Sequence, residues 1–301
     1  MALKDIDVPI ETRRTRGRDG TGITYYVAGT GPKRWLMPPA MGAPLMAMKY
    51  VIERFAREYT IVSWDQRGFY GSDAPGDPDA QSVDDHLGDM HAVVAAEGLE
   101  RFVLGGWSMG VQLSLEYYAR RQADVQALVL ISGPFERALA SVAPIPSVEA
   151  FALAVLRGAG ASSRVLNPLA RTILGAPGVS RVLHRAGLLA ANPEFFERLL
   201  AEFSTVDWGR YFTMTRHLHE HSAAAHLPLV NVPTLIVTGT NDFMTPVSVA
   251  EQMHRRIPGS ELFVLARATH YIVAEFPKQL TDRIALFLAG VAPDQDRVEP
   301  T

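Results

Sequence analysis

The chain has 301 residues and a formal net charge of −3 at pH 7, and 48% of its residues are hydrophobic. This length suits one large domain or a core with an inserted subdomain, and the mixed, near-neutral charge is not that of a nucleic-acid-binding protein. The absence of cysteine excludes disulfides, cysteine nucleophiles and thiolate metal ligands. Because the chain also has no apolar leader and no apolar run of ~20 residues, we expect a cytoplasmic protein.

The first part of the chain alternates short apolar runs with longer amphipathic ones. Strands are predicted at 23–28, 35–37, 59–64, 101–105 and 125–132, and helices at 46–57, 83–98 and 109–121. The strand at 125–132 is almost continuously apolar, which is typical of strands buried on both faces of a parallel sheet. Four N-terminal arginines are predicted to line a solvated strand face: Arg13, Arg14, Arg16 and Arg18.

Between 134 and 226 the pattern becomes helical only. Proline-punctuated helices are predicted at 147–157, 163–174, 179–189, 193–203 and 207–221. Alternation then resumes, with strands at 232–238 and 261–266 and helices at 246–257 and 272–288. This order predicts an α/β fold, a doubly wound and mostly parallel sheet with an inserted α-helical cap. We place the core at 1–133 and 227–290, the cap at 134–226 and a disordered tail at 291–301.

A nucleophile elbow is predicted where the strand at 101–105 ends. The sequence Gly106-Trp107-Ser108-Met109-Gly110 stands between this strand and a helix, which is the context that a Gly-x-Ser-x-Gly elbow requires. The glycines permit a sharp turn with close backbone neighbours, and the helix N-terminus favours developing negative charge. Ser108 is therefore the candidate nucleophile.

A serine nucleophile needs a base, which is itself oriented by a third group. His270 follows a late apolar strand and Asp242 follows the strand before it, so both are expected at the carboxyl edge of the sheet, near Ser108. The order of serine, acid and histidine along the chain favours this assignment. Glu136, which follows the strand at 125–132, is the alternative acid.

These three residues, together with Asp65-Gln66-Arg67-Gly68-x-x-Gly71-Ser72, resemble the α/β-hydrolase superfamily with a helical cap. The resemblance extends over about residues 21–288 and implies a sheet of about eight strands. It implies that Ser108 is the nucleophile, that His270 is the general base and then acid, and that Asp242 orients the histidine. The haloalkane dehalogenase and epoxide hydrolase branches carry aspartate at the elbow instead. For the 65–72 loop the resemblance implies a structural turn.

The resemblance also implies an oxyanion hole made by two backbone amides. One amide is expected from Met109, the residue after the nucleophile. Many relatives carry a His-Gly pair after the third strand, whereas this chain has Pro39-Ala40 there, which makes Met41 the second donor. Aligning Met41-Gly42 with the pair instead would make Ala43 the donor, but Met41 matches the expected strand length.

The predicted cap supplies candidate substrate contacts and a group of histidines. An apolar pocket would suit a hydrophobic acyl or aromatic substrate. We predict substrate contacts from four aromatic residues: Trp107, Trp208, Tyr211 and Phe212. The histidines lack a His-Glu-x-x-His pattern, so we expect no metal and no cofactor despite the grouping of His217, His219, His221 and His226.

The predicted function is a cofactor-independent serine hydrolase. It would cleave a carboxylic ester, lactone or thioester of a small, largely apolar substrate through an acyl-enzyme on Ser108. Carbon–carbon bond hydrolysis and acyl transfer are alternatives on the same triad. A lyase or cyclase that uses Ser108 and His270 as acid–base groups, and a ligand-binding relative, are alternatives from other classes. We expect a small-molecule substrate, no nucleic acid and no membrane partner.

Overall fold

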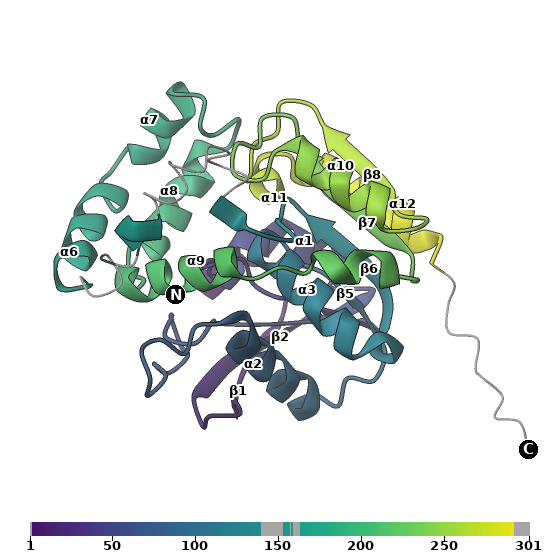
Figure 1. Cartoon of the computed structure of the whole chain (residues 1–301). Helices are drawn as coiled ribbons and strands as arrows, with labels where there is room; N and C mark the ends of the chain where they lie inside the picture. The colour runs from purple at the N-terminus through teal and green to yellow at the C-terminus, as the bar shows by residue number, and fades with distance from the viewer. Residues whose placement is uncertain (1, 140–152, 157, 159–162, 292–301) are drawn as a thin grey trace, which may run out of the picture.

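The centre of the molecule is one eight-stranded sheet, with the strand order β1-β2-β4-β3-β5-β6-β7-β8 (Figure 1). The computed structural model describes residues 2–139, 153–156, 158 and 163–291. β1 and β2 are antiparallel to their neighbours, and the remaining pairs are parallel, which confirms the predicted mostly parallel sheet. The strands are β1 (Ile10–Arg16), β2 (Gly22–Ala28), β3 (Lys33–Leu36), β4 (Tyr59–Trp64), β5 (Phe102–Leu104), β6 (Val125–Ile131), β7 (Thr234–Gly239) and β8 (Glu261–Leu265).

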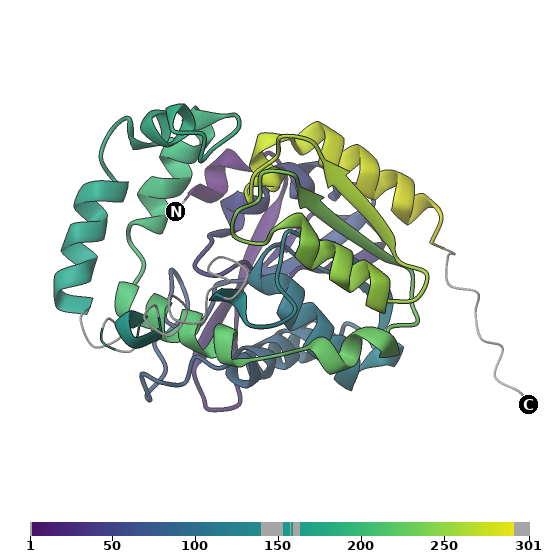
Figure 2. The same cartoon turned by 45° about the horizontal axis from the view of Figure 1, so that its top comes forward.

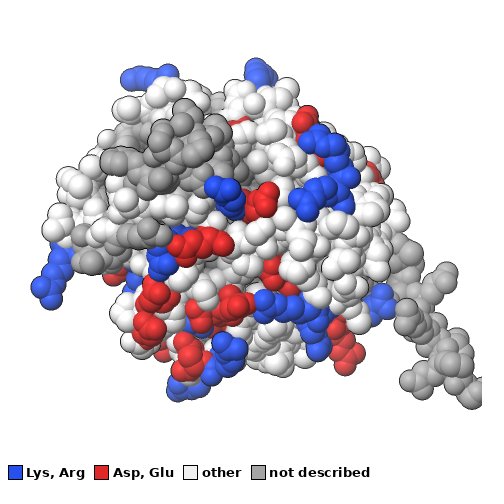
Figure 3. All heavy atoms as spheres, in the orientation of Figure 1, with Lys and Arg blue, Asp and Glu red and all other residues white. Residues whose placement is uncertain are grey.

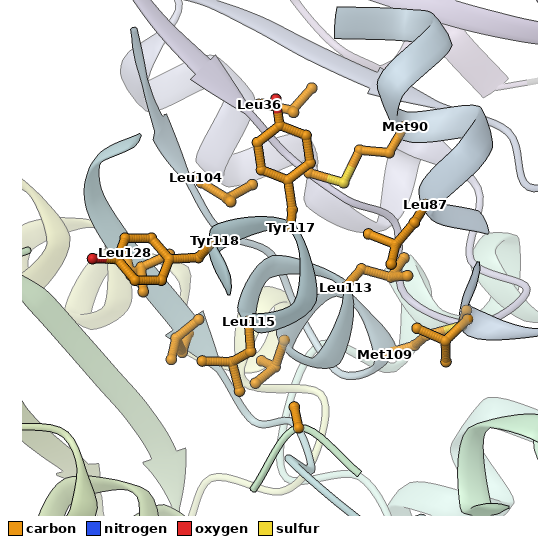
Figure 4. Packing of buried hydrophobic residues seen from close by; sticks show 14 of the residues in the cluster. Leu36, Leu87, Met90, Leu104, Met109, Leu113, Leu115, Tyr117, Tyr118 and Leu128 are labelled. Carbon is orange, nitrogen blue, oxygen red and sulfur yellow. The ribbon is translucent and has the colours of Figure 1, made fainter. Parts of the chain in front are cut away.

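Helices cover both faces of this sheet (Figures 1 and 2). In the first core, Leu87, Leu113 and Tyr117 pack over Leu36 and Leu104 (Figure 4). A second core lies on the opposite face, and the apolar residues of β6 alternate between the two cores, as its continuous hydrophobicity predicts. Helices α2 (Val83–Ala96), α3 (Met109–Arg120) and α10 (Val247–Arg256) cover the first core, and α1 (Lys49–Phe55), α11 (Ile272–Glu275) and α12 (Pro277–Ala289) cover the second.

Two predicted helices are interrupted. The helix expected at 46–57 is a 3-10 turn (Leu45–Met48) followed by α1. The helix expected at 272–288 is α11 and then α12, and Pro277 begins α12. Proline has no N–H to donate and disfavours helical backbone at the residue before it, where Phe276 has φ −130°. Pro277 therefore divides the periodic apolar pattern of residues 272–288 into two helices.

A helical insertion stands between β6 and β7, and Figures 1 and 2 show its helices grouped at one side of the sheet. Most of the predicted helix at 147–157 and the predicted tail, apart from residue 291, lie outside the described residues, and the predicted domain boundaries stay predictions. No helix among the described residues is long and apolar enough to cross a membrane. The insertion comprises α6 (Ser163–Leu174), α7 (Val179–Arg185), α8 (Pro193–Phe203) and α9 (Trp208–Glu220).

The N-terminal arginines of β1 pair with carboxylates on the surface. Arg13 Nη1 lies 2.7 Å from Glu97 Oε1, and Arg14 Nη2 lies 2.8 Å from Asp73 Oδ1. On the face drawn in Figure 3, basic and acidic side chains are interspersed, most densely in its lower half. The expected solvated strand face is confirmed for β1, most of whose residues are exposed.

The 65–72 loop is held by buried polar contacts. Asp65 Oδ2 accepts hydrogen bonds from the Tyr26 hydroxyl at 2.7 Å and from the Gly71 N–H at 2.9 Å. The buried guanidinium of Arg67 donates two hydrogen bonds to Asp89, at 2.7 and 2.8 Å, and pairs with Asp19 at 3.0 Å. Arg67 therefore fixes this loop against α2, in the packing and hydrogen-bonding role expected for it.

His86 on α2 predicts a specific pH dependence of stability. The residue is fully buried, and neither ring nitrogen has a hydrogen-bond partner among the described residues. Burial, with a smaller effect of Arg67, lowers the pKa of His86 from 6.5 to about 3. Between these values the unfolded chain binds a proton on His86 that the folded chain does not. Protonation of His86 in the unfolded chain therefore lowers the free energy of unfolding. This loss is absent above pH 6.5 and grows as the pH falls toward 3.

Replacement of His86 by leucine should remove this pH dependence. Between about pH 7.5 and pH 5, the free energy of unfolding of the wild type should fall by ~2 kcal/mol more than that of His86→Leu. Urea denaturation at the two pH values measures both. Burial also raises the pKa of Asp65 and of Asp89 to about 6, but both residues titrate in either protein, so the difference isolates His86. An equal loss of stability in both proteins would contradict the argument.

Candidate active site

Ser108 lies on the turn between β5 and α3 in a strained backbone conformation, with φ 58° and ψ −120°. A Cβ atom on Gly106 would lie 2.3 Å from the carbonyl oxygen of Pro38, and one on Gly110 would lie 2.5 Å from the same oxygen. Both glycines are thus required because the turn packs directly against the loop after β3. This contact explains the Gly-x-Ser-x-Gly pattern at the level of single atoms.

The structure brings Ser108, Asp242 and His270 together at the carboxyl edge of the sheet, in the loops that follow β5, β7 and β8. His270 Nε2 lies 2.9 Å from Ser108 Oγ, and His270 Nδ1 lies 3.0 Å from Asp242 Oδ2. Asp242 is 4% exposed and His270 is 2% exposed. The geometry is that of a nucleophile in hydrogen-bond reach of a base, which is in turn oriented by a carboxylate.

The carboxylate of Asp242 is held by donors from its own loop. Its Oδ1 accepts hydrogen bonds from the Thr245 N–H at 2.7 Å and the Met244 N–H at 3.0 Å, and its Oδ2 accepts one from the Thr245 hydroxyl at 2.7 Å. Because an ionised carboxylate only accepts, His270 Nδ1 must be the donor to it. In a neutral imidazole this leaves Nε2 free to accept the proton of Ser108.

The Met41 and Met109 amides are free of hydrogen bonds to any residue that the structure describes. By contrast, the Ala43 N–H donates to the Ala40 carbonyl at 3.0 Å, which removes it as a ready donor to a ligand. The Gly42 N–H is also engaged, with Gln66 Oε1 at 2.7 Å. Of the two sequence-based alternatives for the loop after β3, the structure thus leaves Met41 available and Ala43 occupied.

A cavity of about 200 Å³ opens onto Ser108 and His270. Burial raises the pKa of Tyr211 and of Tyr271, so both phenols in its wall stay neutral. No Asp or Glu lines the cavity among the described residues. The cavity therefore suits an uncharged, largely apolar ligand. The insertion contributes Leu183, Leu188, Leu189, Phe196, Leu199, Leu200, Phe203 and Tyr211, and the core contributes Ala40, Met41, Ala43, Pro44, Trp107, Phe243, Met244 and Tyr271.

The four predicted substrate contacts divide into two pairs. Trp107 and Tyr211 line the cavity. Trp208 and Phe212 are not part of its lining, and the Trp208 ring packs behind Tyr211, with ring centroids 5.0 Å apart. Trp208 also stacks edge-on against Phe203 at 5.1 Å. Direct substrate contact is therefore not supported for Trp208 and Phe212, which hold the wall residues in place.

The remaining candidates lie elsewhere. Glu136 Oε2 accepts a hydrogen bond from the Ser222 hydroxyl at 3.1 Å and is not the acid beside His270. No group of three potential metal ligands occurs in the described part of the chain. The four histidines have different partners: His217 contacts Asp79, and His219 accepts from the Leu139 N–H. His221 and His226 both contact Glu116 Oε1, at 2.9 and 3.1 Å.

Three residues of the site were not predicted from the sequence: Gln66, Tyr70 and Thr245. Gln66 and Tyr70 belong to the 65–72 loop, yet both contact Gly42 in the loop after β3, where Gly42 has a φ of +65°. The contacting residues are more than 20 positions apart in the sequence, so no local sequence pattern predicts these contacts. Thr245 stands three residues after Asp242, so its ability to hydrogen-bond the carboxylate could have been inferred from spacing.

The sequence of this chain is similar to those of known proteins over most of its length. The family model for serine aminopeptidase S33 matches residues 46–276. An uncharacterized protein of Mycobacterium tuberculosis is 26% identical over 300 residues, which cover 95% of this chain and 84% of that protein. The pimeloyl-[acyl-carrier protein] methyl ester esterase of Neisseria meningitidis is 27% identical over 209 residues, which cover 66% of this chain and 73% of the esterase.

Solved structures show the same fold. The esterase EaEST from Exiguobacterium antarcticum superposes with a TM-score of 0.73 at 19% sequence identity, and the match covers 93% of this chain and all of that one. At this sequence identity the similarity shows only a shared fold. The family is shown by the family model, which matches most of this chain. The chain is therefore a hydrolase of the α/β-hydrolase superfamily and belongs to the serine aminopeptidase S33 family.

Proposed function

We propose that this chain is a cofactor-independent serine hydrolase that cleaves a carboxylic ester of a small, largely apolar substrate through an acyl-enzyme on Ser108. The observation that carries the proposal is the chain of contacts from Ser108 through His270 to Asp242, at 2.9 and 3.0 Å, at the wall of an apolar cavity. The methyl ester esterase relative supports an ester substrate.

The proposed reaction has two steps. Ser108 Oγ attacks the carbonyl carbon while His270 Nε2 takes its proton, and the N–H groups of Met41 and Met109 stabilise the negative oxygen that forms. His270 then donates the proton to the leaving alkoxide, which departs as the alcohol. In the second step a water gives a proton to His270 Nε2 and attacks the acyl carbon. His270 then returns that proton to Ser108 Oγ as the acid leaves, which restores the free enzyme. Asp242 stabilises the imidazolium in both steps.

Gln66 and Tyr70 are positioning residues in this proposal. Gln66 Oε1 accepts from the Gly42 N–H at 2.7 Å, and the Tyr70 hydroxyl donates to the Gly42 carbonyl at 2.6 Å. Gln66 Nε2 also lies 3.2 Å from Met109 Sδ. The two side chains thus hold the peptide groups before and after Gly42, the residue that follows Met41. An oxyanion donor must be held in place before the charge forms, so the clamp should matter most in the transition state.

Replacement of Gln66 by leucine should lower kcat by about 10-fold to 10²-fold, with KM changed by less than about threefold. Tyr70→Phe, which removes one hydrogen bond, should lower kcat several-fold in the same way. Steady-state kinetics on one ester measures both variants. The control is Gln81→Leu, which removes a buried amide that contacts the same loop at the Arg67 carbonyl and not at Gly42. If both variants lose kcat equally, the loss comes from a general disturbance of the fold, and the positioning role of Gln66 is contradicted.

The choice of ester over peptide substrate rests on the charge of the cavity. An aminopeptidase must bind the ammonium group of its substrate, and a buried ammonium needs a carboxylate partner. The described lining holds none. We therefore expect hydrolysis of p-nitrophenyl esters with short and medium acyl chains, and little hydrolysis of aminoacyl p-nitroanilides. The ester hydrolysis should persist in the presence of a metal chelator. Faster turnover of the anilides would overturn the proposed substrate class.

A further inference from the structure

The outer helices of the insertion carry an exposed apolar stripe. On α6, Val165, Leu169 and Ile173 recur every fourth residue and are 70%, 52% and 53% exposed. This spacing puts them on one face of the helix. On α7, Val182 is 62% exposed. Single exposed apolar side chains are ordinary, but a helical stripe of them marks a surface that another molecule covers.

The segment that contains α6 and α7 is positively charged. Between 163 and 193 the sequence has four arginines and no Asp or Glu, in a chain whose net charge is −3. The side chains of Arg164, Arg171 and Arg185 form no ion pair with any residue that the structure describes. Hydrogen bonds from Ser180 and Gly178 lower the pKa of Glu197, and Arg181 adds a smaller effect in the same direction. A basic flank beside an apolar stripe is the pattern of helices that lie on anionic interfaces.

The apolar surface reaches the cavity. Leu188, which follows α7, is 41% exposed and also lines the wall above Ser108. Figures 1 and 2 place α6 and α7 at the outer edge of the molecule, away from the C-terminal strand β8. A flat surface could therefore contact these helices without meeting the core of the fold.

We propose that the outer face of α6 and α7 docks on an anionic lipid surface. Apolar side chains would enter the interface while the arginines contact lipid phosphates. A second copy of this chain is a poorer occupant, because a symmetric contact would bring two sets of arginines together. This proposal differs from the sequence-based expectation of no membrane partner, and it is independent of the proposed ester hydrolysis.

Vesicle co-sedimentation of the full chain tests the proposal. The Ser108→Ala background prevents turnover of lipid, and the vesicles are phosphatidylcholine alone or with roughly one third phosphatidylglycerol. We expect binding to the anionic vesicles only. Arg164→Gln with Arg171→Gln should weaken it about 25-fold, at roughly fivefold per arginine. Leu169→Ser with Ile173→Ser should weaken it at least about tenfold.

Matched controls come from other surfaces. Leu286→Ser changes a side chain of α12 that is 72% exposed, and Arg57→Gln removes an exposed arginine after α1, and neither should alter binding. Absence of binding to anionic vesicles, or equal binding to both vesicle types, would overturn the proposal. So would a dimer of the wild type that Leu169→Ser with Ile173→Ser dissociates, because the stripe would then be an interface between copies.

Discussion

Replacement of Ser108 by alanine is expected to lower kcat for a p-nitrophenyl ester by about 10⁴-fold to 10⁶-fold. The reason is that, among the described residues, only the Ser108 hydroxyl forms a hydrogen bond with His270 Nε2, and Ser108 lines the cavity. The fold should persist, because alanine meets the same backbone strain at φ 58° as serine does. Ester kinetics together with thermal unfolding measures both parts of the expectation.

Ser114→Ala is the matched control for this substitution. Ser114 is a buried serine on α3, and its hydroxyl donates to the Gly110 carbonyl at 2.7 Å. Its loss should leave kcat within about twofold of the wild type. Two results would argue against the proposed role of Ser108: unfolding of the Ser108→Ala protein, or ester hydrolysis retained within tenfold of the wild type.

Asp242→Asn is expected to lower kcat by about 10⁴-fold near neutral pH. The Thr245 and Met244 N–H groups face Oδ1, so the amide oxygen of asparagine should take that position. The amide NH₂ would then face His270 Nδ1 and donate to it. This forces the ring proton onto Nε2, which can no longer accept the proton of Ser108.

Glu136→Gln separates this effect from a general loss of charge. Glu136 was the other acid that the chain order allowed, and its carboxylate contacts Ser222 rather than His270. Kinetics should be unchanged in Glu136→Gln and severely reduced in Asp242→Asn. The reverse result, with Glu136→Gln inactive and Asp242→Asn active, would mean that the geometry around His270 misassigns the acid.

The parts of the fold that could be predicted from the sequence are those with local signals. About ten consecutive residues are enough to recognise the apolar run of β6. The same holds for the turn from strand to helix around Ser108. Pro277 was also a local signal, and it divides the last helix because the residue before proline leaves the helical region. The order of Ser108, Asp242 and His270 needed only the rule that parallel strands end at one edge.

Contacts that depend on the packing of distant segments could not be predicted. Trp208, Tyr211 and Phe212 share one side of α9 by their spacing, so the sequence could not say which of them faces the cavity. The clamp of Gln66 and Tyr70 on Gly42 joins two loops across the edge of the sheet. The choice between Met41 and Ala43 likewise required the hydrogen bond from Ala43 to Ala40.

Labelling with a fluorophosphonate probe tests the central claim most directly, because the probe reacts only with an activated serine and needs no knowledge of the substrate. Intact-mass measurement and tryptic mapping should find one equivalent of label on peptide 102–120, slower labelling of Asp242→Asn, and no label on Ser108→Ala. Peptide 102–120 also contains Ser114, so the Ser114→Ala protein should label as the wild type does. Folded wild-type protein that takes up no label, or Ser108→Ala protein that still does, would contradict the account.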